Sequence, residues 1–77
     1  MSNNVAEFVN KYVTRELVDD IFGAIISKHG GWNHRLMPLY IDTVCDRINP
    51  DNVYMEDMRK EVIKRLKELD PILFKKV

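Results

Sequence analysis

The 77-residue chain is long enough for one small domain, which can bury only a little over ~60% of its unfolded surface. Its 45% hydrophobic and 31% charged residues suit a folded core and exclude a disordered chain. The net charge is zero, but residues 1–58 carry −4 and residues 59–77 carry +4. This asymmetry can steer an association, although a solvated helix face with a basic tail is the favoured explanation.

Three features of the sequence bear on where the protein resides. Cys45 is the only cysteine, so no internal disulfide can form and a reducing compartment is the simplest context. No apolar run approaches the ~18–20 residues of a membrane span. The N-terminal residues lack the basic and apolar regions of a signal peptide. We therefore expect a cytoplasmic protein, in the producing cell or in a host cell, with no membrane partner.

The apolar spacing of the first half predicts two helices, over about 4–13 and 15–29. Asn4 suits the N-cap of the first helix, as part of a capping box. On one continuous helix, the apolar residues before and after Thr14 would face directions about 160–180° apart. We therefore expect a break, with Thr14 as the N-cap of the second helix, and Gly30 in the left-handed position at its end.

Two further helices are expected over about 36–48 and 54–69. Pro38 fits the first turn of the third helix, and the residues around Pro50 end it, with Asp51 or Asn52 as the next N-cap. The fourth helix is the most clearly amphipathic segment. The apolar face of the third helix contains Leu39, Tyr40, Val44, Cys45 and Ile48, and that of the fourth contains Met55, Met58, Val62, Leu66 and Leu69.

The predicted fold is all-α: a small three- to four-helix bundle, which residues 72–77 extend as a short strand or an extended tail. Ile72, Leu73 and Phe74 are expected to cover the core. Three helices followed by this segment resemble a winged-helix module, and the charged last helix resembles that of the activator-binding KIX domains. No functional residue is transferred, because no specific motif carries either likeness.

Catalytic and metal-binding patterns are absent from the sequence. His29, His34 and Cys45 are the only soft metal ligands, and their spacing matches no zinc motif. Gly30-Gly31 follows a predicted helix, whereas a phosphate-binding loop precedes one. The sequence marks no general base and no orienting acid for a serine or for the cysteine, so it gives no sign of a catalytic nucleophile. We expect a protein that is not an enzyme and that uses no cofactor and no metal.

The loop after the second helix is the most informative local feature for binding. Trp32 and Arg35 belong to the residue types most enriched at interface hot spots, and His34 lies between them. In the alternative interpretation, Trp32 folds back as a lid on the core. A second group of candidate partner-binding residues shares one flank of the fourth helix and comprises Lys60, Lys64 and Lys67.

These observations favour non-enzymatic binding to another protein or protein complex. We expect a small regulator or inhibitor that docks on a larger machine, and a phage or virus is one source that would fit such a protein. The alternative is a helix-turn-helix or winged-helix-like nucleic-acid-binding protein that uses the basic last third, although acidic residues are interleaved there. A homo-oligomer is the third alternative. Salt dependence separates the first two, because phosphate contacts weaken steeply with salt.

Overall fold

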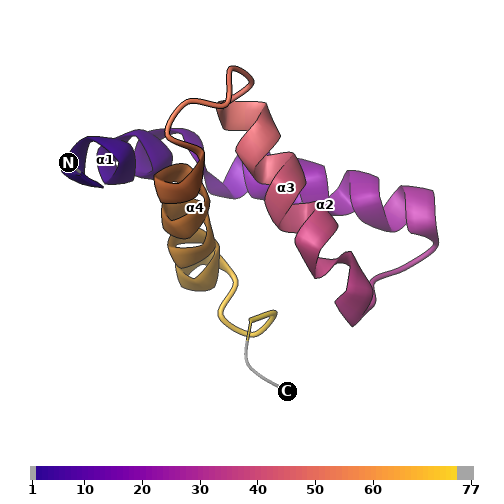
Figure 1. Cartoon of the computed structure of the whole chain (residues 1–77). Helices are drawn as coiled ribbons and strands as arrows, with labels where there is room; N and C mark the ends of the chain where they lie inside the picture. Colours follow the sequence, from indigo (N-terminus) through magenta and orange to yellow (C-terminus); the bar gives the residue numbers. More distant parts are fainter. Residues whose placement is uncertain (1, 75–77) are drawn as a thin grey trace.

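The computed structural model describes the backbone of residues 2–74 and the side chains of residues 4–74. Within this range the chain forms four α-helices, one 3-10 turn and no strand (Figure 1). The predicted all-α bundle is therefore confirmed. The elements are α1 (Ser2–Tyr12), α2 (Arg15–His29), η1 (His34–Leu36), α3 (Met37–Ile48) and α4 (Met55–Leu69).

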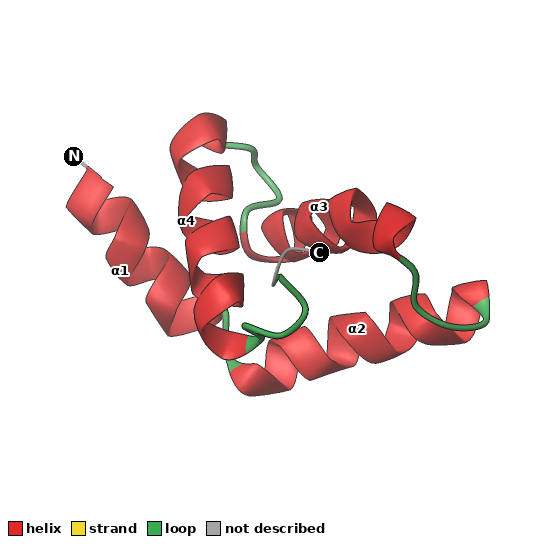
Figure 2. Ribbon diagram, turned by 90° about the horizontal axis from the view of Figure 1, so that it is seen from below, coloured by secondary structure: helices red, strands yellow, loops and turns green. Residues whose placement is uncertain are grey.

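The helices form two pairs, α1 with α4 and α2 with α3, and the core lies between these pairs. The chain bends between α1 and α2, and α3 then folds back across α2 at a steep angle (Figures 1 and 2). α4 then crosses α1 and also packs against α3. Each helical segment contributes three buried apolar side chains, with Val13 counted with α1. They are Val5, Val9, Val13, Val18, Ile21, Ile25, Tyr40, Ile41, Val44, Met58, Val62 and Leu66.

The predicted break after the first helix is confirmed. α1 ends at Tyr12, and the hydroxyl of Thr14 accepts a hydrogen bond from the Leu17 N–H at 3.2 Å as the N-cap of α2. This bend lets the apolar faces of both helices meet one core. Gly30 has φ 75° and ends α2 in the left-handed conformation, as its sequence context predicts.

Two predicted N-caps are wrong. Asn4 lies inside α1, because the helix already begins at Ser2, two residues before the predicted cap. α4 is preceded by Tyr54 in a left-handed conformation, with no side-chain cap, rather than by Asp51 or Asn52. The third and fourth helices agree with the predicted ranges to within one residue at their starts, and residues 34–36 form the additional turn η1 before α3.

Some predicted core positions are exposed. Met55 is 59% exposed and Leu39 is 40% exposed, whereas Ile41 is buried although it was not expected in the core. At the C-terminal end, residues 71–74 form a turn rather than a strand, and the prediction for residues 75–77 lies outside the described residues. In this turn Leu73 and Phe74 pack against the core as predicted, beside Leu69 of α4. The same prediction is wrong for Ile72, which is 84% exposed.

Candidate functional site

The predicted binding loop is only partly available at the surface. The Trp32 indole is half-buried, with its ring centroid 4.9 Å from that of Phe22 and 5.7 Å from that of Tyr40. This packing is the arrangement expected of a core lid. His34 and Arg35 are exposed on η1, where the Asn33 side chain accepts a hydrogen bond from the Arg35 N–H at 2.8 Å. The loop therefore offers two polar side chains.

The predicted lysine group lies elsewhere on the molecule. Lys60, Lys64 and Lys67 are exposed on α4, on the side opposite its buried stripe. No carboxylate oxygen of residues 4–74 lies within the 4.0 Å ion-pair distance of their amino groups. Figures 1 and 2 both place α4 away from the loop between α2 and η1. The two predicted groups therefore do not form one surface.

A third surface lies between α3 and α4, and we call its residues Val53, Tyr54 and Met55 the α3–α4 tip. All three side chains are more than half exposed, and Tyr54 is the most exposed of them at 72%. Single exposed apolar residues are normal on a protein surface, but consecutive ones that include an aromatic are typical of binding sites. The α3–α4 tip is therefore our candidate functional site.

The backbone of the α3–α4 tip is held by one buried amide. The Asn49 side chain is 6% exposed, and its Nδ2 donates to the Val53 carbonyl at 2.9 Å while its Oδ1 accepts from the Val53 N–H at 3.2 Å. The Asn52 N–H also donates to the Asn49 carbonyl at 3.1 Å. With Val53 held on both sides, the tip is fixed before any partner arrives.

Tyr54 occupies an unfavourable backbone conformation. Its φ is 49° and its ψ is 47°, in the left-handed region, and Asn52 shares this region with φ 57°. Asparagine tolerates this conformation, whereas a bulky aromatic residue loses about 1–2 kcal/mol there. The Tyr54 carbonyl accepts the Met58 N–H at 2.8 Å and so begins the hydrogen bonding of α4. This backbone geometry directs the chain into α4 and leaves the Tyr54 ring exposed.

Carboxylates surround the α3–α4 tip. They come from α3 (Asp42, Asp46), from the turn before the tip (Asp51) and from the first turn of α4 (Glu56, Asp57). Arg59 pairs with Asp42, whereas no cationic group of residues 4–74 lies within 4.0 Å of the other carboxylates. Met55 separates two hollows, of about 310 Å³ toward α3 and about 470 Å³ toward Glu56 and Asp57.

Sequence reasoning missed this site because it assigned Met55 to the core stripe of α4 and gave Val53 and Tyr54 no role. One signal was available. Two large apolar residues, Val53 and Tyr54, follow the turn-forming segment 49–52, before the helical spacing starts at Met55. Large apolar residues in a turn that no predicted helix would cover are expected to be exposed and are candidates for binding a partner.

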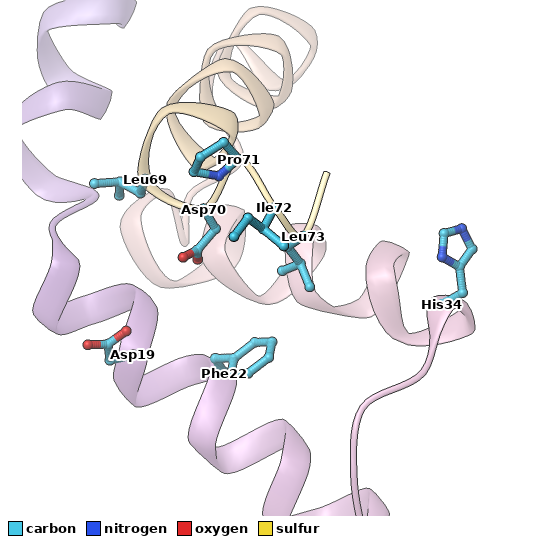
Figure 3. Close-up of a pocket in the computed structure, with 8 residues that line it drawn as sticks. All are labelled: Asp19, Phe22, His34, Leu69, Asp70, Pro71, Ile72 and Leu73. Atoms are coloured by element: carbon cyan, nitrogen blue, oxygen red, sulfur yellow. The ribbon is translucent and has the colours of Figure 1, made fainter. Parts of the chain in front are cut away.

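A groove of about 600 Å³ lies between α2, η1 and the C-terminal turn. Figure 3 shows Phe22 on one side and Ile72 and Leu73 on the other, with Asp19 and Asp70 at one end. Both carboxylate oxygens of Asp70 are already engaged: Oδ1 accepts from Arg15 Nη1 at 3.0 Å, and Oδ2 accepts from the Tyr40 hydroxyl at 3.2 Å. The polar end of the groove therefore serves to join helices.

The electrostatics of this joint follow from burial and pairing. The hydrogen bond and the charge of Asp70 raise the pKa of the Arg15 guanidinium. Burial raises the pKa of the Tyr40 hydroxyl, and the nearby Asp70 carboxylate raises it further. Arg15 also donates to the Leu69 carbonyl, so the end of α4 is bound to the start of α2. This joint explains the position of the C-terminal turn.

Within residues 2–74, no three histidine, cysteine, aspartate or glutamate residues lie together as a metal ion would require. None of the helices in that range has the length and apolar character needed to cross a membrane. Comparison of the chain with family models, with curated proteins and with solved structures found no match.

Proposed function

We propose that the chain is a non-enzymatic protein-binding protein, a small regulator or inhibitor that docks on a larger protein through the α3–α4 tip. The single observation that carries the proposal is the Tyr54 ring, 72% exposed on a backbone that Asn49 holds in place. Tyrosine is enriched at interface hot spots, because it brings a large rigid area and one polar group. A fixed loop also loses little conformational freedom when it binds.

The backbone strain at Tyr54 supports the same proposal. Sparsely populated conformations of non-glycine residues cluster at sites of function, where the surrounding structure holds them. Glycine at position 54 would relieve the strain. The chain instead has an exposed tyrosine at this position. Contact between this ring and a partner accounts for that combination.

Affinity capture tests the proposal. The tagged chain is used to capture partners from a lysate of its native host after nuclease treatment, beside a Tyr54→Ala variant and a matched control, Tyr12→Ala. Tyr12 is another half-exposed tyrosine, on α1, far from the tip in sequence. Truncation of a hot spot costs at least ~2 kcal/mol of binding, or about thirtyfold in affinity.

We expect Tyr54→Ala to lose the captured protein, with helical circular dichroism and cooperative melting unchanged, and Tyr12→Ala to retain it. Retention by a folded Tyr54→Ala variant would reject the α3–α4 tip as the interface. Arg35→Ala belongs in the same experiment, because His34 and Arg35 are exposed on η1. Loss of capture in Arg35→Ala alone would place the interface at η1, and Trp32→Ala would then show whether its indole contributes to binding or only to stability.

One observation favours the alternative function, a nucleic-acid-binding protein. Lys60, Lys64 and Lys67 face outward on α4 without a carboxylate of residues 4–74 at ion-pair distance. Their amino groups could meet phosphates, each of which adds to the salt dependence of binding. This alternative predicts that nuclease removes the captured material and that replacing the three lysines with glutamine weakens capture. The protein-binding proposal predicts neither result.

A further inference from the structure

We propose that the segment of the partner that contacts the α3–α4 tip is basic, with an arginine side chain stacked on Tyr54 and paired with Glu56 or Asp57. This inference rests on the proposed function and specifies the chemistry of the partner. It is carried by the charge around the tip and by the shape of the hollow beside it.

The charge argument starts from the carboxylates that lack a partner. Among residues 4–74, the acidic groups around the tip other than Asp42 have no cation within 4.0 Å, and Asp42 already holds Arg59. The N-terminal end of α4 offsets part of the charge of Glu56 and Asp57. Asp46 and Asp51 lie outside α4 and receive no such compensation. A partner surface of positive potential therefore complements the tip, and a negative one is repelled.

The shape argument concerns the outer hollow, a shallow and open depression of about 470 Å³, which is lined by Asn52, Tyr54, Met55, Glu56 and Asp57. It combines an aromatic ring, an apolar side chain and two carboxylates in one recess. A guanidinium can stack flat on a tyrosine ring while its N–H groups pair with a carboxylate, and its methylene stem can cover methionine. A lysine ammonium lacks the planar, bidentate geometry.

The recess does not suit a metal ion. No group of three histidine, cysteine, aspartate or glutamate residues within residues 2–74 is close enough to hold one. Beside the two carboxylates and the Asn52 amide, the lining consists of the Tyr54 ring and the Met55 side chain, whose apolar surfaces do not bind hard cations. An organic cation with an apolar stem would contact the aromatic ring, the methionine and a carboxylate together, whereas a metal ion would leave the ring and the methionine unused.

Nuclear magnetic resonance titration of the ¹⁵N-labelled chain tests the inference. The probes are synthetic 12-residue peptides with two arginines at spacings of two to four among leucine, serine and alanine. Each arginine peptide is matched by one with lysine and one with glutamate at the same positions. We expect the arginine peptides to shift the amide signals of residues 52–57, the lysine peptides to bind about two- to fivefold more weakly, and the glutamate peptides not to bind.

Variants separate the contribution of the Tyr54 ring from that of the carboxylates of Glu56 and Asp57. Tyr54→Ala should weaken the arginine peptides and remove their advantage over the lysine peptides, whereas Glu56→Gln with Asp57→Asn should weaken both sets and reduce their salt dependence. The control replaces two exposed carboxylates outside the tip, Glu7→Gln with Glu16→Gln, and should change neither. Unchanged amide signals of the control would show that its fold is intact.

Three results would overturn the inference: no shifts at residues 52–57 with any arginine peptide, equal binding of the glutamate peptides, or full binding by the Glu56→Gln, Asp57→Asn variant. None of them depends on the capture experiment. If capture requires Tyr54 while basic peptides fail, the protein-binding function stands and the basic partner is rejected. If capture does not require Tyr54, the proposed function itself fails.

Discussion

At position 54, a tyrosine occupies a left-handed backbone conformation that is energetically unfavourable for a bulky side chain. Tyr54 adopts φ 49°, which glycine tolerates without steric cost. Tyr54→Gly should therefore raise the free energy of unfolding by about 0.5–1 kcal/mol, because relief of about 1–2 kcal/mol of strain exceeds the added freedom of the unfolded chain. Urea denaturation measures the difference. The comparison is Tyr54→Ala, which keeps the strained backbone, and a Tyr54→Gly variant less stable than Tyr54→Ala would contradict the strain.

One face of α4 is buried and the other is exposed, so substitutions on the two faces should differ in their effect on stability. Leu66 is fully buried, so Leu66→Ala should destabilise the domain by about 2–5 kcal/mol, a large part of the stability of a chain of this size. Lys64 is exposed on the other side of the same helix, and Lys64→Ala should change stability by less than ~0.5 kcal/mol. Denaturation midpoints of the two variants provide the measurement. Equal losses would mean that the buried face of α4 is assigned wrongly.

At the scale of the element, the C-terminal turn combines one exposed and two packed apolar residues. Leu73 and Phe74 contact the core cluster, whereas Ile72 is 84% exposed. The double variant Leu73→Ala, Phe74→Ala should therefore lower the thermal midpoint by several degrees, since each half-buried side chain contributes about 1 kcal/mol. Ile72→Ala is the matched control and should leave the midpoint unchanged. An equal effect of the control would show that the turn packs through Ile72.

The helices could be predicted because the apolar residues of each recur at helical spacing. They therefore lie on one face, which packs against a neighbouring helix. The break at Thr14 could also be predicted, because the two apolar faces cannot reach one core along a straight helix. The start of α4 could not. Its N-terminal residue depends on the side-chain hydrogen bonds between Asn49 and Val53, which fix the turn before the helix. This contact cannot be predicted from the residue types that are preferred at N-caps.

At the scale of the whole molecule, spacing shows which side of a helix is apolar but not whether another element lies opposite each residue. Met55 continues the stripe of α4, yet it precedes the part that α1 and α3 cover, and it is 59% exposed. The α3–α4 tip therefore could not be predicted from periodicity. The same reasoning applies to Trp32, whose packing on Phe22 and Tyr40 requires α2 and α3 to lie side by side.

The joint between Arg15, Tyr40 and Asp70 connects α2, α3 and the end of α4, so it affects the stability of the whole molecule. Burial holds the pKa of Tyr40 above the ordinary tyrosine value of 10.0. In the unfolded chain this hydroxyl ionises near its ordinary pKa, whereas in the folded chain it stays protonated. The stabilising contribution is therefore complete below pH ~10 and is lost as the pH rises above that value.

Tyr40→Phe should reduce stability at neutral pH by about 1 kcal/mol, through loss of the hydrogen bond to Asp70, and should also flatten the decline of stability above pH ~10. Urea denaturation between pH 7 and 11 measures both effects. Some decline should remain, because burial also raises the pKa of the Cys45 thiol. Tyr54→Phe is the matched control, since its hydroxyl is on an exposed ring, and it should follow the wild-type profile. A Tyr40→Phe variant with the wild-type slope above pH 10 would show that Tyr40 ionises in the folded chain as readily as in the unfolded one.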